Sequence, residues 1–536
     1  MSRAAESIDL NDIPYARGAR YVEEKGCLPG TRETIIQDIC GVLNNPGEGG
    51  PRVCLLTGVA GSGKSAVAHS IARLYDGQKR LGSSYCFLRS DVTRRNPQNF
   101  FSTVALDLAD HDPQYKTELC QIVKNNRSLR TSVSLSEQVK RLIIEPNQRL
   151  HSIGPLVIVV DALDESGDLS NRRSLLRAFS EHISDLPTNL RFLITARPES
   201  DILAALASSP QVVHRQLGDV AQDVVDQDIG KFIRHSLHQY SELESAWPNE
   251  VWCRLLVRHS QHLFQWASTA CRFIEGDAGA VGLNIRERLQ ILLQRKNDVG
   301  VHPLDDLYRT ILGQLFTLDH VQDKFREVMA FVLVLKEPLS LVSLSSLFDH
   351  DPNIRDIIKP LGSLLDGAHN EQKLIRPLHT SFRDFLLDDA RSLSFHVDIL
   401  PRHSLSLGHA SLCHMRKTLK FNICGLKDSR LRNSAVPDLA DRVTKAISPC
   451  VAYSCQYWMD HMQHAECTTE LLDEVTSFFK KFFPFWLEAI SLYSVFQPVS
   501  STLCALTTCT ILRKWAKVGS MSHNGMMNIE HDDIGP

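Results

Sequence analysis

The sequence predicts an α/β domain built on a parallel sheet, followed by a long helical region. Between Arg52 and about Leu217, continuous runs of Val, Ile and Leu alternate with amphipathic helical patterns. Such runs are typical of strands that are buried on both faces of a parallel sheet. From about residue 220 the pattern changes to helical periodicity with few interruptions. At 536 residues the chain is long enough to form several domains.

A lead-in segment, residues 1–50, precedes the first predicted strand. It contains turn residues at Cys27–Gly30 and then a helical pattern from Thr31 to Leu43. The next residues, NNPGEGGP, are rich in Asn, Gly and Pro and predict a loop. We therefore expect the α/β domain to begin at residue 51.

Four apolar runs are the predicted strands of this domain. In chain order they are VCLLTG, SYCFLRS, LVIVVD and LRFLITA. A helical pattern follows VCLLTG. Three more lie between SYCFLRS and LVIVVD, the first of them from Asn99 to Leu108. Another helical pattern separates LVIVVD from LRFLITA. The α/β domain therefore covers residues 51–217.

The strongest motif lies between the first strand and the helix that follows it. The sequence GVAGSGKS satisfies GxxxxGK[ST] in the strand, loop and helix setting of a phosphate-binding loop. Its glycines let the backbone curl, so that successive N–H groups face one phosphate at the positive end of a helix. We expect Lys64 to neutralise the β- and γ-phosphates and Ser65 to ligate Mg²⁺. The predicted nucleotide-binding residues of this loop are Gly58, Val59, Ala60, Gly61, Ser62, Gly63, Lys64, Ser65 and Ala66.

Three acidic residues lie at and just after the end of the strand LVIVVD. Asp161 is delivered to the carboxyl edge of the sheet, where ligands of open α/β sheets bind, and is the second predicted Mg²⁺ residue. Hydrolytic enzymes with such a loop often place a glutamate directly after this aspartate, but here the position is Ala162. Asp164 and Glu165 are the candidate catalytic residues, since either can polarise water, and either can instead cap the next helix.

Arg197 follows the last predicted strand at the same edge of the sheet. In LITARPE, Pro198 forces the chain out of the strand, which fits a turn at the strand end. A cation at this edge can sense a γ-phosphate and so distinguish ATP from ADP. An exposed loop arginine is the alternative.

These motifs together resemble the NACHT branch of the STAND signalling ATPases, and within it the fungal-type proteins with a nephrocystin-like N-terminal domain. The matching phrases are CLPGTRE, TGVAGSGKSAVAHSIA, VVDALDES, FLITARPE and PLDDLYRTIL, and the resemblance covers about residues 15–458. Ala162 followed by Asp164 and Glu165 is itself the NACHT form of the acidic motif. The resemblance implies a helical domain at 218–302, a winged-helix domain at 303–395 and a C-terminal helical region at 396–536.

The resemblance also implies roles for residues outside the loop. In related proteins a winged-helix histidine touches the bound diphosphate, and LHTSFRDFL places His379 at the matching position; a solvated or core histidine is the common alternative. Thr31 or Arg32 is the candidate for a contact with adenine. The segment HLFQWASTACRFI resembles the family signature GLFIWAATA, but His262 replaces the glycine and Gln265 replaces an apolar residue.

The resemblance implies a signalling switch that rests with ADP, exchanges it for ATP with Mg²⁺, and then assembles with copies of itself. The expected setting is innate-immunity-like or cell-death signalling after non-self recognition, with separate sensor or effector proteins as partners. We expect at most a slow regulatory ATPase. The alternatives are a nucleotide-binding scaffold with little or no hydrolysis and a small-molecule phosphotransferase. The latter needs an arginine-bearing lid and an acceptor pocket, for which the sequence gives no sign.

Composition argues against several other classes of protein. A formal net charge of -3 gives no overall attraction toward nucleic acid, and the sequence lacks interleaved aromatic and basic runs. The 14 cysteines lack zinc-finger spacing and favour reduced thiols in a cytoplasmic protein. The uncharged stretch Ala489–Leu512 contains Pro, Gln, Ser and Thr, which favours core helices over a stable membrane span.

Overall fold

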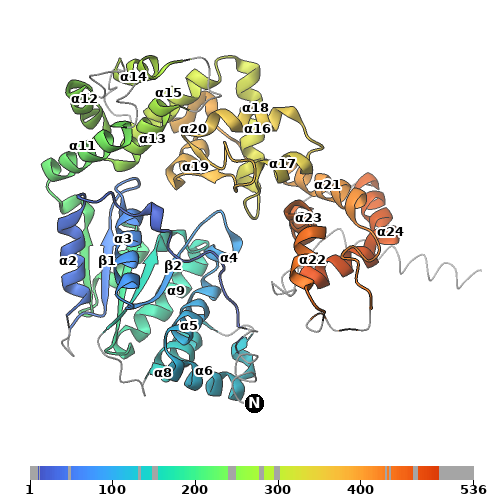
Figure 1. Ribbon diagram of the computed structural model, residues 1–536, viewed down its shortest axis with the longest axis horizontal. Helices are drawn as coiled ribbons and strands as arrows, with labels where there is room; N and C mark the ends of the chain where they lie inside the picture. The colour runs from blue at the N-terminus through green and yellow to red at the C-terminus, as the bar shows by residue number, and fades with distance from the viewer. Residues whose placement is uncertain are drawn as a thin grey trace, which may run out of the picture. The chain divides into compact units, whose positions relative to one another are not determined.

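The computed structural model describes residue 10 and residues 13–493, apart from 46–49, 131–133, 148–154, 239–248, 277–282, 295–301, 429–430, 432, 434–435 and 463–468. The chain packs as two units (Figure 1). Of the described residues, the first unit comprises those up to Gly276, those from Leu283 to Ile311 and the short segment His379–Ser381. The second comprises those in Leu312–Leu378 and those from Phe382 to Tyr493.

A five-stranded parallel sheet forms the centre of the first unit (Figure 1), which confirms the predicted fold of this part of the chain. The strand order is β2-β3-β4-β1-β5, and all four pairings are parallel. The carboxyl ends of β3, β4 and β1 therefore lie side by side. The strands are β1 (Val53–Thr57), β2 (Leu81–Cys86), β3 (Leu156–Asp161), β4 (Leu190–Ala196) and β5 (Val212–Gln216).

Helices cover both faces of the sheet, and this explains the continuous apolar runs. Leu55 and Ile158 belong to one buried cluster, together with side chains of α5 (Phe100–His111), α6 (Pro113–Asn125) and α9 (Leu169–His182). The next residues along the same strands, Leu56 and Val159, belong to the opposite cluster with α2 (Glu33–Leu43) and α3 (Lys64–Gly77). Successive strand side chains alternate between faces, and both faces are dry.

Strand β5 is not predicted from the sequence. Its residues Val212, Val213, His214 and Arg215 are only partly buried, and Gln216 is exposed. An edge strand of this composition has no continuous apolar run, so the pattern used for the other strands does not detect it.

Short helices and turns complete the sheet region of the first unit, and longer helices follow it. The short ones are η1 (Glu23–Lys25), α4 (Val92–Arg95), η2 (Pro97–Asn99), η3 (Arg127–Arg130), α7 (Leu135–Gln138), a π-helix at Val139–Ile144, α8 (Glu145–Asn147), η5 (Leu163–Glu165), η6 (Ile183–Asp185), α10 (Ser200–Ile202), a π-helix at Leu203–Ala207 and η8 (Leu217–Asp219). The longer ones are α11 (Gln222–His238), α12 (Glu250–Ser260), α13 (Phe264–Glu275), α14 (Ile285–Leu293) and α15 (Pro303–Leu315), whose last residues belong to the second unit.

The second unit is mainly helical and contains one short antiparallel strand pair. The pair joins β6 (Leu365–Asp366) to β7 (Arg376–Pro377), and α19 (Thr380–Leu386) follows. The other elements are α16 (Asp319–Val334), α17 (Leu341–Leu347), α18 (Pro352–Ile358), η10 (Lys359–Leu361), α20 (Asp389–Ser392), η11 (Leu393–Phe395), α21 (Pro401–Thr418), α22 (Leu439–Ala446), α23 (Pro449–Met462) and α24 (Thr469–Tyr493).

Helices α21 to α24 enclose a core of their own, in which Trp458 and Trp486 are buried and pack edge to face. No helix in the described part of the chain has the length and apolar content needed to cross a bilayer. Of the uncharged stretch Ala489–Leu512, the first five residues belong to α24 and residues 494–512 lie outside the described residues.

Candidate functional site

The loop GVAGSGKS connects β1 to α3 at the carboxyl edge of the sheet. Gly61 and Gly63 have φ angles of 81° and 98°, which residues with a side chain rarely adopt. The N–H of Gln265 donates to the carbonyl of Gly61 at 3.1 Å, and a Cβ on Gly61 would lie 2.9 Å from the Cβ of Gln265. Glycine is thus required at position 61 both by the turn and by the close approach of α13.

Lys64 lies across this loop. Its Nζ donates to the carbonyl oxygens of Gly58 at 2.7 Å and Val59 at 3.0 Å. Burial lowers the pKa of Lys64, and the carboxylates of Asp164, Asp161 and Glu165 oppose that shift. An ammonium group in such surroundings is stabilised by an anionic ligand such as a phosphate.

Asp161 and Ser65 supply oxygen atoms beside the loop. Asp161 ends β3 and is 5% exposed, and its Oδ1 accepts a hydrogen bond from Thr195 Oγ1 at 2.6 Å. Ser65 lies in the first turn of α3 and is exposed. One carboxylate and one hydroxyl fit Mg²⁺, which prefers oxygen ligands and keeps several of its waters. These residues would hold the ion, which would supply positive charge beside the phosphates.

The chain turns sharply after β3, where Ala162 has a φ angle of 56°. The short helix η5 follows and carries Asp164 and Glu165, which contact different partners. Asp164 is 3% exposed and faces Arg197: its Oδ1 accepts from the backbone N–H of Arg197 at 3.0 Å, and its Oδ2 lies 3.3 Å from Nε. The geometry therefore makes Asp164 an orienting partner of the arginine at the end of β4.

Glu165 is 7% exposed, and its Oε2 accepts a hydrogen bond from the backbone N–H of Arg89 at 2.9 Å. Burial, and after it the neighbouring charge of Asp164, raises the pKa of Glu165 to about 7. A carboxyl group with a pKa near the working pH can both accept and release a proton. Of the two candidate catalytic acids, Glu165 has the surroundings that suit proton transfer.

The segment His379–Ser381 lies beside Arg197 within the first unit. Arg197 Nη2 donates to Thr380 Oγ1 at 2.8 Å. The Nδ1 atom of His379 accepts from the backbone N–H of Ser381 at 3.1 Å, and the Ser381 hydroxyl is 2.8 Å from that of Tyr308. The structure thus brings together an arginine predicted as a phosphate sensor and the residue next to the predicted diphosphate histidine.

Arg32 contacts the loop, whereas Thr31 donates to the carbonyl of Leu28 in its own turn at 2.6 Å. Arg32 is buried, and its Nη2 donates to the carbonyl of Ser62 at 2.8 Å. Its backbone N–H donates to Asp228 at 2.8 Å, and its guanidinium lies 4.7 Å from the ring centre of Phe264. Arg32 therefore joins the lead-in segment, the loop, α11 and α13.

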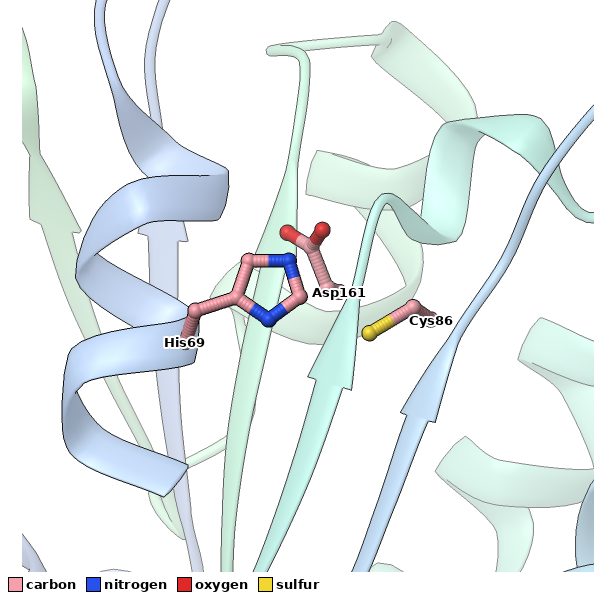
Figure 2. A group of neighbouring side chains, drawn as sticks. All are labelled: His69, Cys86 and Asp161. Carbon is pink, nitrogen blue, oxygen red and sulfur yellow. The ribbon is translucent and has the colours of Figure 1, made fainter. Parts of the chain in front are cut away.

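Two residues beside the Asp161 carboxylate are not predicted from the sequence. Thr195 donates to this carboxylate, and His69 of α3 lies beside it, as does Cys86 at the end of β2 (Figure 2). One available signal is a polar residue inside an apolar pattern, since His69 interrupts AVAHSIA and Thr195 interrupts LRFLITA. That signal alone does not say which acid the two residues face.

Comparison with known proteins gives matches of different extent. Residues 30–197 match the family described as Nephrocystin 3, N-terminal. The vegetative incompatibility protein HET-E-1 of Podospora anserina is 24% identical over 368 residues, which are 62% of this chain and 25% of that protein. The chain thus spans about a quarter of the length of this relative. These two matches confirm the resemblance that the sequence motifs indicate.

Two solved structures also align, with TM-scores too low to indicate a shared overall fold. One is a Signal Transduction ATPase with Numerous Domains (STAND) protein with a tetratricopeptide repeat sensor from Pyrococcus horikoshii, at 11% identity and a TM-score of 0.34, covering 93% of this chain and 73% of that one. The other is Drosophila ORC bound to DNA, at 12% identity and a TM-score of 0.30, covering 70% of this chain and 97% of that one.

Proposed function

We propose that this chain, whose nucleotide-binding portion is of the NACHT/STAND type, is a nucleotide-dependent signalling switch. At rest it holds ADP with Mg²⁺; exchange for ATP releases the resting contacts, and the chain then assembles with copies of itself. The loop around Lys64 supports phosphate binding, and Asp161 with Ser65 supports a magnesium site.

The hydrogen bond from Arg197 to Thr380 is the observation that carries the proposal. It joins the end of β4 to a segment 183 residues further along the chain. A γ-phosphate is a stronger acceptor for a guanidinium than a threonine hydroxyl is. ATP would therefore compete with Thr380 for Arg197, whereas ADP would not. A switch requires such a difference in contacts between its two ligands.

The biological setting is part of the proposal. The relative HET-E-1 is described as a vegetative incompatibility protein, and this supports a role in non-self recognition or cell-death signalling. We propose the cytoplasm as the location of this signalling. The chain's partners would be sensor or effector proteins.

A scaffold with very slow hydrolysis is the second candidate. It is favoured by the pairing of Asp164 with Arg197, which engages one of the two candidate catalytic acids in a structural contact. The two functions share nucleotide storage and differ in whether bound ATP is turned over.

The proposal is tested by loosening the contacts of the segment His379–Ser381. Thr380→Val removes the hydroxyl that Arg197 contacts, and His379→Ala removes the neighbouring ring. We expect roughly tenfold faster release of a fluorescent ADP analogue, as the loss of one charge-assisted hydrogen bond of about 1.5 kcal/mol implies. Self-assembly, followed by light scattering, should then need less ATP.

Thr444→Val is the matched control, because Thr444 is exposed and its hydroxyl donates within its own helix α22 to the carbonyl of Ala440. It should leave ADP release unchanged. Wild-type release rates and an unaltered assembly profile in both Thr380→Val and His379→Ala would overturn the proposed switch.

A further inference from the structure

His69, Cys86 and Asp161 form a buried cluster at the carboxyl edge of the sheet (Figure 2). They come from α3, the end of β2 and the end of β3, and each is 5% or 6% exposed. A ring nitrogen, the thiol sulfur and a carboxylate oxygen all lie within 4.8 Å of one another. By residue type the cluster is a candidate for a transition metal, since zinc takes histidine, cysteine and aspartate ligands.

The hydrogen bonding of His69 argues against a resident metal. The backbone N–H of Val22 donates to His69 Nδ1 at 3.1 Å. A nitrogen that accepts a hydrogen bond carries no proton, so a neutral imidazole must carry its proton on Nε2. Figure 2 shows Nε2 turned toward the carboxylate of Asp161. This nitrogen therefore presents an N–H to the acid, and it has no lone pair to offer a metal while the Val22 contact is kept.

The carboxylate of Asp161 accepts a hydrogen bond from one element and lies beside the His69 ring of another. Thr195 of β4 donates to Oδ1 at 2.6 Å, and the Nε2–H of His69 faces the carboxylate from α3. Donors of this kind fix the orientation of an acid that binds a metal and tune its strength as a ligand.

The other side of His69 is tied to the lead-in segment, which packs along α3 and β2. The Cys27 N–H donates to Ser70 Oγ at 2.7 Å, the Tyr21 N–H donates to Ser84 Oγ at 3.0 Å, and the Cys86 N–H donates to the Ala19 carbonyl at 2.7 Å. The Val22 contact is thus one of several that hold this segment against the nucleotide-binding fold.

We propose that His69 is a positioning residue that links the docked lead-in segment to the magnesium-binding carboxylate of Asp161. Docking of residues 19–27 fixes the ring through Val22, and the ring in turn orients the carboxylate. Undocking of residues 19–27 would then weaken metal binding, while the bond from Arg32 to Ser62 of the phosphate loop stays in place. The inference rests on the proposed function, because it gives Asp161 the magnesium role.

Two conservative variants separate the two contacts of His69. Glutamine can place an N–H near the position of Nε2 but offers no acceptor at Nδ1, so His69→Gln keeps the contact with Asp161 and loses that with Val22. Asparagine can place an acceptor near the position of Nδ1 but does not extend to that of Nε2. His69→Asn therefore keeps the contact with Val22 and loses that with Asp161. His182→Gln is the control, since His182 bonds to Ser136 in the same unit.

The experiment measures three quantities on the full chain. They are the affinity for Mn²⁺ in the presence of ADP by electron paramagnetic resonance, the affinity for ADP in EDTA, and hydrogen exchange of the peptide that contains Val22. His69→Asn should lower Mn²⁺ affinity about 10–100-fold and leave ADP affinity in EDTA and the exchange of that peptide unchanged. His69→Gln should keep Mn²⁺ affinity within about threefold and speed exchange at Val22.

Unchanged Mn²⁺ affinity in His69→Asn would overturn the inference. Equal losses of Mn²⁺ affinity and ADP affinity in both variants would also overturn it, because they would indicate that His69 has a purely structural role. Tight binding of Zn²⁺ that depends on both His69 and Cys86 would also overturn it, in favour of a metal site. Failure of the proposed function has a different signature: Lys64→Ala would then bind ADP in EDTA as the wild type does.

Discussion

Single residues decide what the site can do with a bound nucleotide, and Glu165 is the clearest example. It follows Asp164 directly, yet Asp164 is held by Arg197 whereas Glu165 accepts a backbone N–H and has its pKa raised to about 7. A burial-raised pKa keeps the carboxyl group protonated in acid and ionised only above about 7. Its capacity to act as a base therefore grows across the neutral range.

The corresponding prediction concerns a single turnover of bound ATP. If Glu165 is the base, the rate should rise with pH through about 7, because only the ionised carboxylate accepts a proton. Glu165→Gln should slow it roughly 100-fold and remove the pH dependence. Hydrolysis followed by quenched-flow chromatography between pH 6 and 8.5 checks this. A flat profile in the wild type, or an unchanged rate in Glu165→Gln, would exclude Glu165 as the base.

The sequence predicts the residue types of the site but few of their pairings. The loop residues around Lys64 and the acid Asp161 follow from a motif and a strand end, both of which are local. The bond from Arg197 to Thr380 spans 183 residues, and nothing in either local pattern indicates it. The same holds for His69, whose role depends on a backbone group 47 residues earlier.

The burial of each strand determines whether its position can be predicted from the sequence. Strands β1, β3 and β4 are buried along their full length and are read from continuous apolar runs. Strand β2 is also buried but contains Ser83 and Ser84, whose hydroxyls bond to Asp107 and to the N–H of Tyr21. The partly buried edge strand β5 has no such run and is missed.

Helix packing gives a stability prediction in the second unit, where α21 packs on α23. A Cβ on Gly408 would lie 2.7 Å from Met462 Cγ and 3.4 Å from the Trp458 carbonyl, whereas a Cβ on Gly313 meets no atom within 4 Å. Gly408→Ala should destabilise by about 1–3 kcal/mol through overpacking. Gly313→Ala, the control, should stabilise by up to about 1 kcal/mol.

Urea unfolding monitored by tryptophan fluorescence measures both changes, since Trp458 and Trp486 are buried in the core of α21 to α24. A Gly408→Ala variant as stable as Gly313→Ala would contradict the tight contact between these helices.

Each of the two packed units is built from several segments of the chain, so no single position in the sequence separates one unit from the other. The segment His379–Ser381 packs with the first unit, although the residues on both sides of it pack with the second. The boundary predicted at residue 217 comes from a change in local pattern, and those at residues 302 and 395 come from the family resemblance; all three remain predictions. A three-residue segment that packs with a distant part of the chain leaves no compositional trace, so sequence periodicity cannot detect it.

We propose that the loop GVAGSGKS stores ADP at rest, and the nucleotide content of the purified protein is the measurement that tests this proposal. Denaturing the protein and separating the released nucleotides by chromatography should give nearly one ADP per chain for the wild type. Lys64→Ala should release little, because the ammonium that lies across the loop is gone. A wild-type protein that is purified empty and turns over ATP rapidly would contradict the account.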